Sequence, residues 1–260
     1  MMFIKDVSVV EMVKMKVHIR YIGHSTFLLH LNSEKEKISI MTDPWFDKGT
    51  FYLKRIVPPA VDLEKIQKCD FLLVSHSHRD HLDHVTLKYA RKKWDPTIIG
   101  PPSVVSKAKK YGISKTVTAH PGASLNMDNF TVNVVRAVHP VWGGKDAVGY
   151  VIVLDGCTIY FSGDTLYVDE VVKDVNNFKI HVAILPIGSV KFLFRKAVMD
   201  IYDAIKFALD IQPKIVIPMH YNVLKGTEAN PEEMKKPLAE KGIELRILNP
   251  GDTTIIECTS

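Results

Sequence analysis

The sequence predicts an α/β protein in which two mixed β-sheets pack face to face and helices cover their outer sides. Short runs of β-branched and aromatic residues recur between turn residues, which is typical of many short strands. Longer runs with helical spacing lie between them. The chain has 260 residues, 46% of them hydrophobic, and shows no repeat, low-complexity stretch or linker. We therefore expect residues 1–260 to form a single domain around one large core.

Strands are predicted where a β-branched or apolar run ends at turn residues. The run 130–138, for example, stops at His139 and Pro140, because proline cannot donate to a β-ladder and favours a turn. In chain order, the predicted strands are residues 17–21, 25–31, 38–42, 71–75, 97–100, 115–119, 130–138, 147–154, 157–162, 182–186, 214–219, 244–248 and 253–257.

Helices are predicted for the longer runs that lie between these strands. Pro231, followed by Glu232 and Glu233, is typical of a helix start. Proline suits the first helical turn, and acidic side chains favour the positive end of the helix dipole. The predicted helices are residues 82–94, 102–111, 168–177, 196–209 and 231–241.

The most informative motif is an H-x-H-x-D-H string at residues 76–81, directly after an apolar run. Side chains alternate along an extended segment, so His76 and His78 point to the same side and can bind one ion. Asp80 and His81 follow where the chain turns toward a helix, so they can face a second ion. Imidazole nitrogens and carboxylate oxygens suit divalent ions such as zinc. The motif therefore predicts a metal site.

Three further residues of ligand type stand at the ends of predicted strands. His139 and His220 each follow an apolar run. Asp164 follows another, and the preceding Gly163 lets the backbone approach a site closely. A hydrolytic site with two ions needs more ligands than the four in the motif, and these residues can supply them.

In ligand types and in their order, nearly the whole chain resembles the metallo-β-lactamase superfamily. The resemblance implies a four-layer αββα sandwich whose two β-rich halves meet near residues 125–130. It also implies two divalent ions; mixed N/O ligands without thiolate favour zinc, with manganese or iron as alternatives. The first ion would have three imidazole ligands, namely His76, His78 and His139. The second would be held by Asp80, His81 and His220, and Asp164 would bridge the two ions.

Two further segments are similar to one branch of this superfamily. A G-H-S strand at residues 23–25 and a T-D-P turn at residues 42–44 resemble ascorbate 6-phosphate lactonase-like proteins and the N-acyl-phosphatidylethanolamine phospholipase D. Within the turn, Asp43 is expected to orient a ligand imidazole through its other nitrogen. Arg79 departs from many relatives, which carry a small or aromatic residue there, and it changes the local electrostatics.

The resemblance implies a hydrolase in which a hydroxide, bridged between the two ions, attacks the substrate, because divalent ions lower the pKa of bound water. No serine or cysteine nucleophile is needed. The candidate catalytic residues are Asp80, Asp164 and His24. The proton for the leaving group would come from Asp164, His24 or a metal-bound water. For His24, a hydrogen-bonded core histidine is the alternative interpretation.

The expected substrate is a small anionic ester or lactone. Only 55 residues separate Asp164 from His220, which leaves no space for the inserted domain of the β-CASP nucleases. Two alternatives stay open: a phosphodiesterase of the same superfamily, of nuclease or phospholipase D type, and a non-catalytic metal-binding protein. The segment 191–195 mixes aromatic and cationic residues. It is predicted to be a lid over an anionic group, or else a loop packed on the core or in a subunit interface.

Cysteine usage and charge favour a cytoplasmic protein. Cys69, Cys157 and Cys258 are far apart and form no C-x-x-C pair, so reduced thiols are expected. Charged residues interrupt every apolar run in residues 1–16, so neither a signal peptide nor a membrane span is expected there. The net charge of +5 comes without a dense Lys/Arg patch, so nothing indicates a nucleic-acid partner. A homo-oligomer stays open.

Overall fold

Two seven-stranded sheets form the centre of the computed structural model, which describes residues 15–32, 37–50, 53–127, 129–154, 156–192 and 195–258. The first sheet has the order β16-β1-β2-β3-β4-β5-β6 and the second the order β15-β14-β11-β10-β9-β8-β7. Each has an antiparallel part and a parallel part. The predicted pair of mixed sheets is therefore confirmed.

Most strands of the first sheet come from the first half of the chain, and those of the second sheet follow them. The first sheet consists of β1 (Met15–Gly23), β2 (Thr26–Asn32), β3 (Lys37–Thr42), β4 (Phe71–Leu73), β5 (Thr97–Gly100), β6 (Thr116–Thr118) and β16 (Thr253–Cys258). The second consists of β7 (Ser124–Asn126), β8 (Thr131–Arg136), β9 (Val148–Leu154), β10 (Cys157–Phe161), β11 (Val182–Pro186), β14 (Ile215–Met219) and β15 (Glu244–Leu245). A separate hairpin consists of β12 (Lys191–Phe192) and β13 (Arg195–Lys196).

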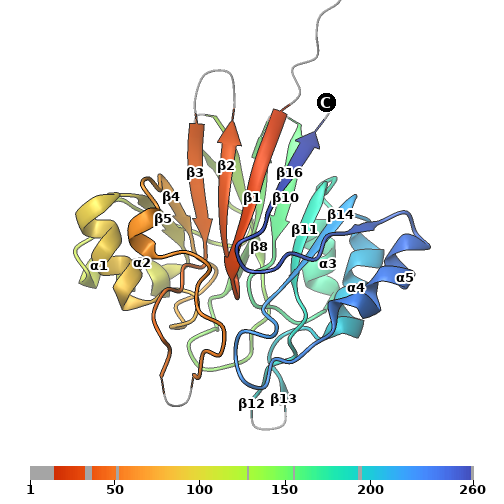
Figure 1. Ribbon diagram of the computed structural model, residues 1–260. Helices are drawn as coiled ribbons and strands as arrows, with labels where there is room; N and C mark the ends of the chain where they lie inside the picture. The colour runs from red at the N-terminus through yellow and green to blue at the C-terminus, as the bar shows by residue number, and fades with distance from the viewer. Residues whose placement is uncertain are drawn as a thin grey trace, which may run out of the picture.

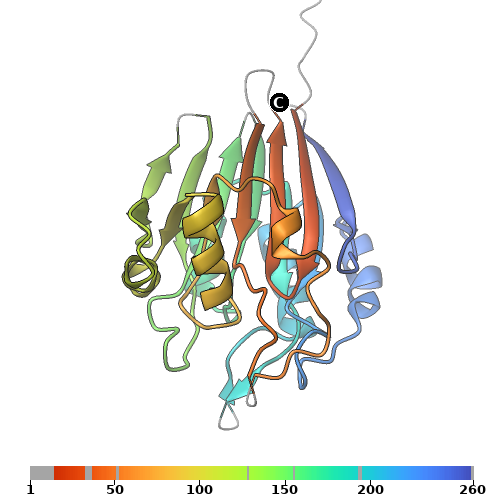
Figure 2. The same ribbon diagram turned by 60° about the vertical axis from the view of Figure 1, so that its left-hand side comes forward.

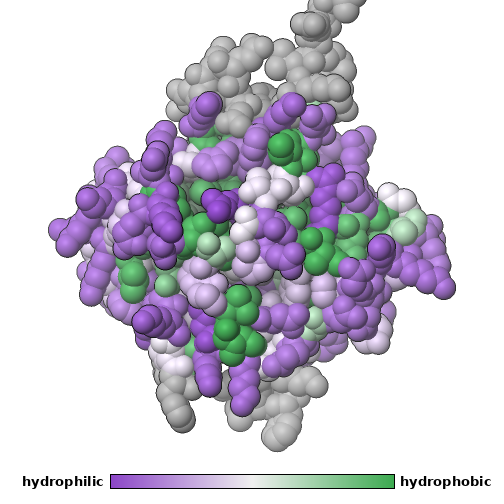
Figure 3. Space-filling model, in the orientation of Figure 1, coloured by the Kyte–Doolittle hydropathy of each residue, from purple (hydrophilic) through white to green (hydrophobic). Residues whose placement is uncertain are grey.

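Helices cover the outer side of each sheet (Figures 1 and 2). On the first sheet these are α1 (His84–Lys93) and α2 (Pro102–Lys110); on the second, α3 (Asp169–Val175), α4 (Ile201–Ile211) and α5 (Lys235–Ala239). The 3₁₀-helices η1 (Leu63–Lys65) and η2 (Pro231–Met234) precede β4 and α5. None of the described helices lies in front of β1 and β2 (Figure 1), and the surface there mixes hydrophilic and hydrophobic residues (Figure 3).

The core lies between the two sheets, and its origin is the alternation of side chains along the strands. In β1, Val17, Ile19 and Tyr21 are buried against the second sheet, whereas His18 and Arg20 point to the outer side and are only partly buried. Separate apolar clusters hold α1 and α2 on the first sheet and α3, α4 and α5 on the second. The αββα layering therefore follows because the sheets and the helices both have apolar faces to bury.

Strand direction brings the candidate site residues to one edge of the sandwich. Because β1 and β3 both run antiparallel to β2, and β4 runs parallel to β3, the carboxyl ends of β1, β3 and β4 meet at this edge. In the second sheet β8, β10, β11 and β14 likewise share one direction. The residues that follow these strands therefore face one another across the two sheets.

Several element boundaries differ from the sequence prediction. The helix predicted for residues 196–209 begins only at Ile201, because residues 195 and 196 pair as β13 and Asp200 caps the helix by accepting from the Asp203 backbone. The helix predicted for residues 231–241 is divided into η2 and α5. The short strand β7 was not predicted. The first sheet changes to the second between β6 and β7, slightly before the predicted boundary at residues 125–130.

The expectation of three reduced cysteines was wrong. Cys157 at the start of β10 and Cys258 at the end of β16 form a disulfide that links the two sheets, while Cys69 is a free, buried thiol. A separation of 101 residues gives no hint of this pair; the two residues meet only because the sheets face each other. We expect denatured, unreduced protein to show one reactive thiol, and reduced protein to show three. Three reactive thiols without reduction would contradict the pairing.

Among the described residues, no helix has both the length and the apolar character needed to cross a membrane. The prediction for residues 1–16 falls mainly on residues 1–14, which lie outside the described part of the chain.

Candidate metal centre

The seven predicted metal-binding residues come together at the edge where the strands end. His76, His78, Asp80 and His81 follow β4, and His139, Asp164 and His220 follow β8, β10 and β14. The backbone here is unusual, since His24, Asp43 and His220 all have positive φ angles, 61°, 34° and 58°. Non-glycine residues rarely adopt this conformation, and the residues that do are enriched at functional sites.

The first group consists of three imidazoles that converge on one point. His78 Nδ1 lies 2.8 Å from His76 Nε2 and 3.3 Å from His139 Nε2. The other ring nitrogens of two of them are bound to carbonyl oxygens: His78 Nε2 lies 2.8 Å from Trp142 O, and His139 Nδ1 lies 2.8 Å from Ala197 O. A carbonyl oxygen only accepts, so these outer nitrogens carry the protons. The inward nitrogens of His78 and His139 are left with lone pairs.

A chain of hydrogen bonds through Asp43 fixes two more imidazoles in the same way. The Ser75 hydroxyl donates to Asp43 Oδ2 over 2.6 Å, so it must accept from His76 Nδ1, 2.9 Å away. His81 Nδ1 lies 2.7 Å from the same carboxylate. Both outer nitrogens are therefore protonated, and Nε2 of each ring is free to bind an ion. This geometry is the one expected for Asp43 from the sequence.

The second group contains His24, Asp80, His81 and His220, whose ligand atoms all lie within 4.8 Å of one another. Several buried polar atoms here have no hydrogen-bond partner among the described residues: His24 Nδ1, His81 Nε2, both nitrogens of His220, and Asp164 Oδ1. Unpaired buried polar atoms are costly unless something binds them. A divalent ion would satisfy His81 Nε2 and the neighbouring groups, so these residues fit a metal site.

Asp164 lies between the two groups. Its Oδ2 is 3.3 Å from His81 Nε2 and 3.3 Å from His220 Nε2 in the second group, and 3.9 Å from His139 Nε2 in the first. The side chain is almost fully buried. One carboxylate therefore faces both clusters of imidazoles, as a bridging ligand must.

The electrostatics of the site favour a cation. Burial alone would lower the pKa of His81, but Asp164, Asp80 and Asp43 outweigh burial and hold the pKa well above its ordinary value. Burial alone would raise the pKa of Asp164, but His220 and His81 outweigh it and hold that pKa well below its ordinary value. Buried carboxylates thus attract positive charge to this point, and a divalent ion can supply it in place of protons.

His24 is part of the second group and is fully buried. Its Nε2 lies 3.2 Å from Asp80 Oδ2, and its ring lies 4.0 Å from that of His220. Burial, followed by the neighbouring His220, lowers the pKa of His24 to about 3. The neutral ring can donate from Nε2 and so orient the Asp80 carboxylate. His24 is thus both buried, as in the core interpretation, and in contact with a candidate ligand.

Two glycines let the backbone come close to these side chains. A Cβ on Gly163, where φ is +57°, would lie 2.4 Å from Ser75 Cβ, and a Cβ on Gly144 would lie 2.2 Å from His139 Cδ2. Real Cβ atoms do not approach other atoms so closely, so any larger residue must displace Ser75 or His139. The close approach of the backbone that was expected at Gly163 is confirmed. The similar close approach of Gly144 to His139 was not predicted from the sequence.

Arg79, the departure from many relatives, is bound to Asp47. Arg79 Nε lies 2.6 Å from Asp47 Oδ2, and Trp45 Nε1 donates to Asp47 Oδ1 over 2.6 Å. Trp45 in turn packs edge-on against His24, with ring centroids 5.1 Å apart. The segment around Asp47 therefore supports the metal-binding turn from one side. Sequence reasoning missed Asp47, because a single aspartate in a loop carries no pattern.

Lys107 in α2 supports the same turn from the other side. Its ammonium group donates to the carbonyl oxygens of Ser77, which lies within the motif, and of Leu82, which directly follows it. We expect Lys107→Met to lower the free energy of unfolding by about 1–3 kcal/mol, because two partly buried carbonyls lose their donor. Chemical denaturation measures the loss, and Lys109→Met, an exposed lysine on the same helix, is the control. Equal stability of the two variants would refute the role of Lys107.

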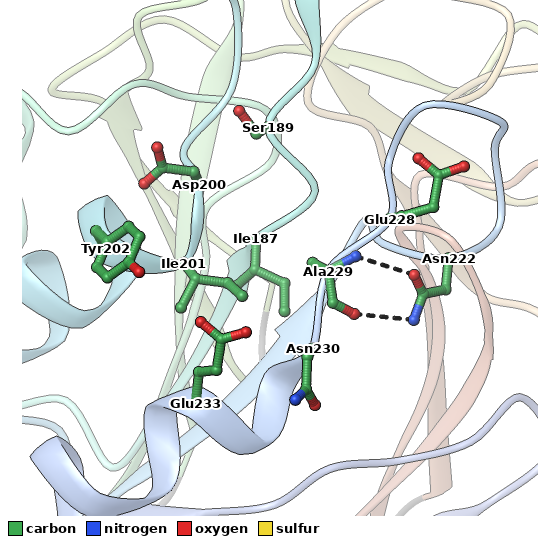
Figure 4. A pocket seen from close by; sticks show the side chains of 10 residues that line it. All are labelled: Ile187, Ser189, Asp200, Ile201, Tyr202, Asn222, Glu228, Ala229, Asn230 and Glu233. Atoms are coloured by element: carbon green, nitrogen blue, oxygen red, sulfur yellow. Dashed lines mark hydrogen bonds between the residues drawn. The ribbon is translucent and has the colours of Figure 1, made fainter.

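A cavity of about 460 Å³ lies beside the site (Figure 4). Its walls come from the segments after β11 and β14, including Asn222 two residues beyond His220, and from the starts of α4 and η2. Figure 4 shows the carboxylates of Asp200, Glu228 and Glu233 around it. None of its lining residues in the described part of the chain is basic. The cavity gives no support to an anion at this place.

The hairpin of β12 and β13 contains the predicted lid. It projects from the same end of the molecule as the site residues (Figure 1). Lys191 pairs with Lys196 and Phe192 with Arg195, whereas residues 193 and 194 lie outside the described part of the chain. Its role as a lid stays a prediction.

Comparison with known proteins identifies relatives over most of the chain. The family profile described as "Beta-lactamase superfamily domain" matches residues 18–220. A UPF0173 metal-dependent hydrolase of Nanoarchaeum equitans is 31% identical over 238 residues, 89% of this chain and 96% of the relative. Igni18, a metallo hydrolase from Ignicoccus hospitalis, has a TM-score of 0.75 at 25% identity, over 93% of this chain and 99% of that one. An isothiocyanate hydrolase from Delia radicum gut bacteria shares the fold, with a TM-score of 0.76 at 20% identity, over 93% and 99%.

Proposed function

Since this chain belongs to the metallo-β-lactamase superfamily of metal-dependent hydrolases, we propose that it hydrolyses a small anionic ester or lactone at a centre of two divalent ions. The ligands we assign to the first ion are His76, His78 and His139. Those assigned to the second are Asp80, His81 and His220, with Asp164 shared.

One observation carries this proposal: Asp164 Oδ2 faces both groups of imidazoles, at 3.3 Å from His81 and His220 and 3.9 Å from His139. The protonation of the outer ring nitrogens supports it further, because four imidazoles present lone pairs inward. Nitrogen and carboxylate ligands without thiolate suit zinc, and manganese and iron are the alternatives.

Two ions held there would lower the pKa of bound water and so supply the nucleophile, and they would polarise the bond that breaks. The protein's part is to hold the ligands in place. Asp43 fixes His81 directly and His76 through Ser75. His24 lies behind Asp80 and is fully buried, so we assign it a positioning role. Asp80 and Asp164 are the carboxylates that we place next to the reacting groups, and Asp164 is the candidate for carrying a proton to the leaving group.

The anionic character of the substrate rests on the cation beside the metal-binding turn. Arg79 keeps 37% of its side chain exposed while its Nε is bound to Asp47. The positive charge of a guanidinium beside the turn favours a substrate that carries a carboxylate or phosphate group. The preference for a lactone or ester over a phosphodiester rests on the branch that the G-H-S and T-D-P segments resemble, and it stays a prediction.

The test is steady-state hydrolysis by metal-loaded protein of a sugar-acid lactone and of bis(4-nitrophenyl) phosphate, side by side. We expect turnover of the lactone and its loss after metal is removed with a chelator. Restoration by added zinc or manganese would tie the activity to the centre. Turnover of the phosphodiester alone would move the protein to the phosphodiesterase class. Tight metal binding without turnover of either would favour the non-catalytic alternative.

A further inference from the structure

A second cavity, of about 330 Å³, lies on the outer face of the first sheet, away from the candidate metal ligands. Its floor is formed by outward-facing residues of β1, β2 and β3, and its wall by Lys65 at the end of η1 and residues 66–68 that follow it. None of the described α-helices lies in front of this part of the sheet (Figure 1). The lining residues are Arg20, Leu28, His30, Lys37, Ser39, Lys65, Ile66, Gln67 and Lys68.

The lining is strongly basic. Among the described residues, the lining contains four cationic side chains, those of Arg20, Lys37, Lys65 and Lys68, and no acidic one. Just outside the lining, Asp62 pairs with Lys65 at 3.1 Å and Asp70 pairs with Lys68 at 2.9 Å. These exposed or half-exposed pairs are weak in water. Even counting them as neutralised, two positive charges, those of Arg20 and Lys37, remain among the described lining residues.

Arg20 adds a second kind of evidence. Arg20 Nε is shielded from solvent and has no hydrogen-bond partner among the described residues. Partial burial, and then the neighbouring His18 and Arg20, lower the pKa of His30, whereas Asp70 raises it. A buried donor without an acceptor is unfavourable, and an anion that reaches the Arg20 guanidinium would supply an acceptor.

We propose that this cavity binds the phosphate group of a small phosphorylated molecule. A phosphate dianion offers oxygens in several directions, so it can accept from the Arg20 guanidinium and from the surrounding ammonium groups at once. Leu28 and Ile66 provide apolar contact for the rest of the ligand. The adjoining cavity of about 620 Å³ shares Lys37 and Lys68 and gives that part space. The site is independent of the hydrolytic centre, because it shares no residue with it.

The probe is inorganic phosphate, titrated into metal-loaded protein and followed by calorimetry and by the NMR signals of the His30 ring. The test variant is Lys37→Gln/Lys65→Gln, since both lysines are exposed and their replacement leaves the core intact. The matched control is Lys173→Gln/Lys206→Gln, which removes two exposed lysines from α3 and α4 on the second sheet. Phosphate held by the metal centre would remain in both variants.

We expect the His30 signals to move on titration of the unmodified protein, and the test variant to bind phosphate at least about tenfold more weakly, with the control unchanged. Equal weakening in both double variants would show a diffuse attraction to net positive charge and overturn the proposal. So would phosphate binding that leaves the His30 signals in place. Arg20→Gln should weaken binding as well, and a normal affinity of that variant would contradict the role of its guanidinium.

Co-sedimentation with vesicles that contain phosphatidic acid distinguishes a small phosphorylated molecule from a lipid headgroup as the source of the phosphate group. We expect them to leave the protein in solution, because the ligand is a small molecule. Co-sedimentation that depends on Lys37 and Lys65 would identify a lipid headgroup instead and overturn that assignment.

Discussion

Asp164→Asn is expected to lower hydrolysis by more than about a hundredfold and to reduce the bound metal per chain. Loss of an outer partner of a metal ligand typically costs ten- to a hundredfold in affinity or activity, and a shared ligand should cost more. The amide has the same shape as the carboxylate but lacks its charge, so the fold should survive. The measurements are kcat/KM for the best substrate and the metal content of purified protein.

The control for Asp164 is Asp169→Asn, an exposed aspartate in the first turn of α3. It removes the same charge from the protein and should keep both activity and metal. A fully active and fully metal-loaded Asp164→Asn protein would refute the bridging role. Loss of activity with both ions retained would instead assign Asp164 to proton transfer alone.

Asp43→Asn is expected to weaken metal binding about ten- to a hundredfold, although Asp43 is not a predicted ligand. Its Oδ1 accepts from the Ser75 backbone at 2.6 Å, and its Oδ2 accepts from Ser75 Oγ and from His81 Nδ1. An asparagine has one acceptor oxygen, so its NH₂ group must face a donor. The proton of His81 would then be favoured on Nε2, the atom meant for the ion.

Asp70 provides a close control for Asp43. Asp70 Oδ2 accepts from Ser39 N at 2.9 Å and from Ser39 Oγ at 2.8 Å, far from the candidate ligands. Both Asp→Asn variants should lose about 1–3 kcal/mol of stability from the weakened aspartate–serine contact. Only the Asp43 variant should lose metal affinity, as measured by competition with a chromophoric chelator. Equal metal affinity in the two variants would contradict the orienting role of Asp43.

The candidate ligands are predictable from the sequence because each follows a strand, and strands that share a direction end at one edge. The same logic predicts that His76, Asp164 and His220 lie close together. It says nothing of the groups that fix the rings, since the carbonyl oxygens of Trp142 and Ala197 come from distant loops and a backbone carbonyl has no residue signature.

The disulfide between two of the cysteines was also not predictable from the sequence. The pairing of Cys157 with Cys258 depends on how two sheets face each other, which no local pattern encodes. The start of α4 differs from the prediction for a related reason. The apolar spacing of residues 196–209 suits a helix, but the first of them pairs in the β12–β13 hairpin, so the helix begins later. Local periodicity predicts the kinds of element, and long-range pairing decides their ends.

The strand β16 is paired along its whole length with β1, with Lys16 opposite Glu257 and Arg20 opposite Thr253. During synthesis on the ribosome, β1 emerges early and its partner only after almost all the described residues have been made. Until then the nascent first sheet keeps an open edge with unsatisfied backbone groups, which is the kind of surface that chaperones bind and that promotes aggregation. Completion of this sheet therefore waits until the strands of the second sheet have been made, and messages that end before the codons for β16 should yield chains that are cleared by proteolysis.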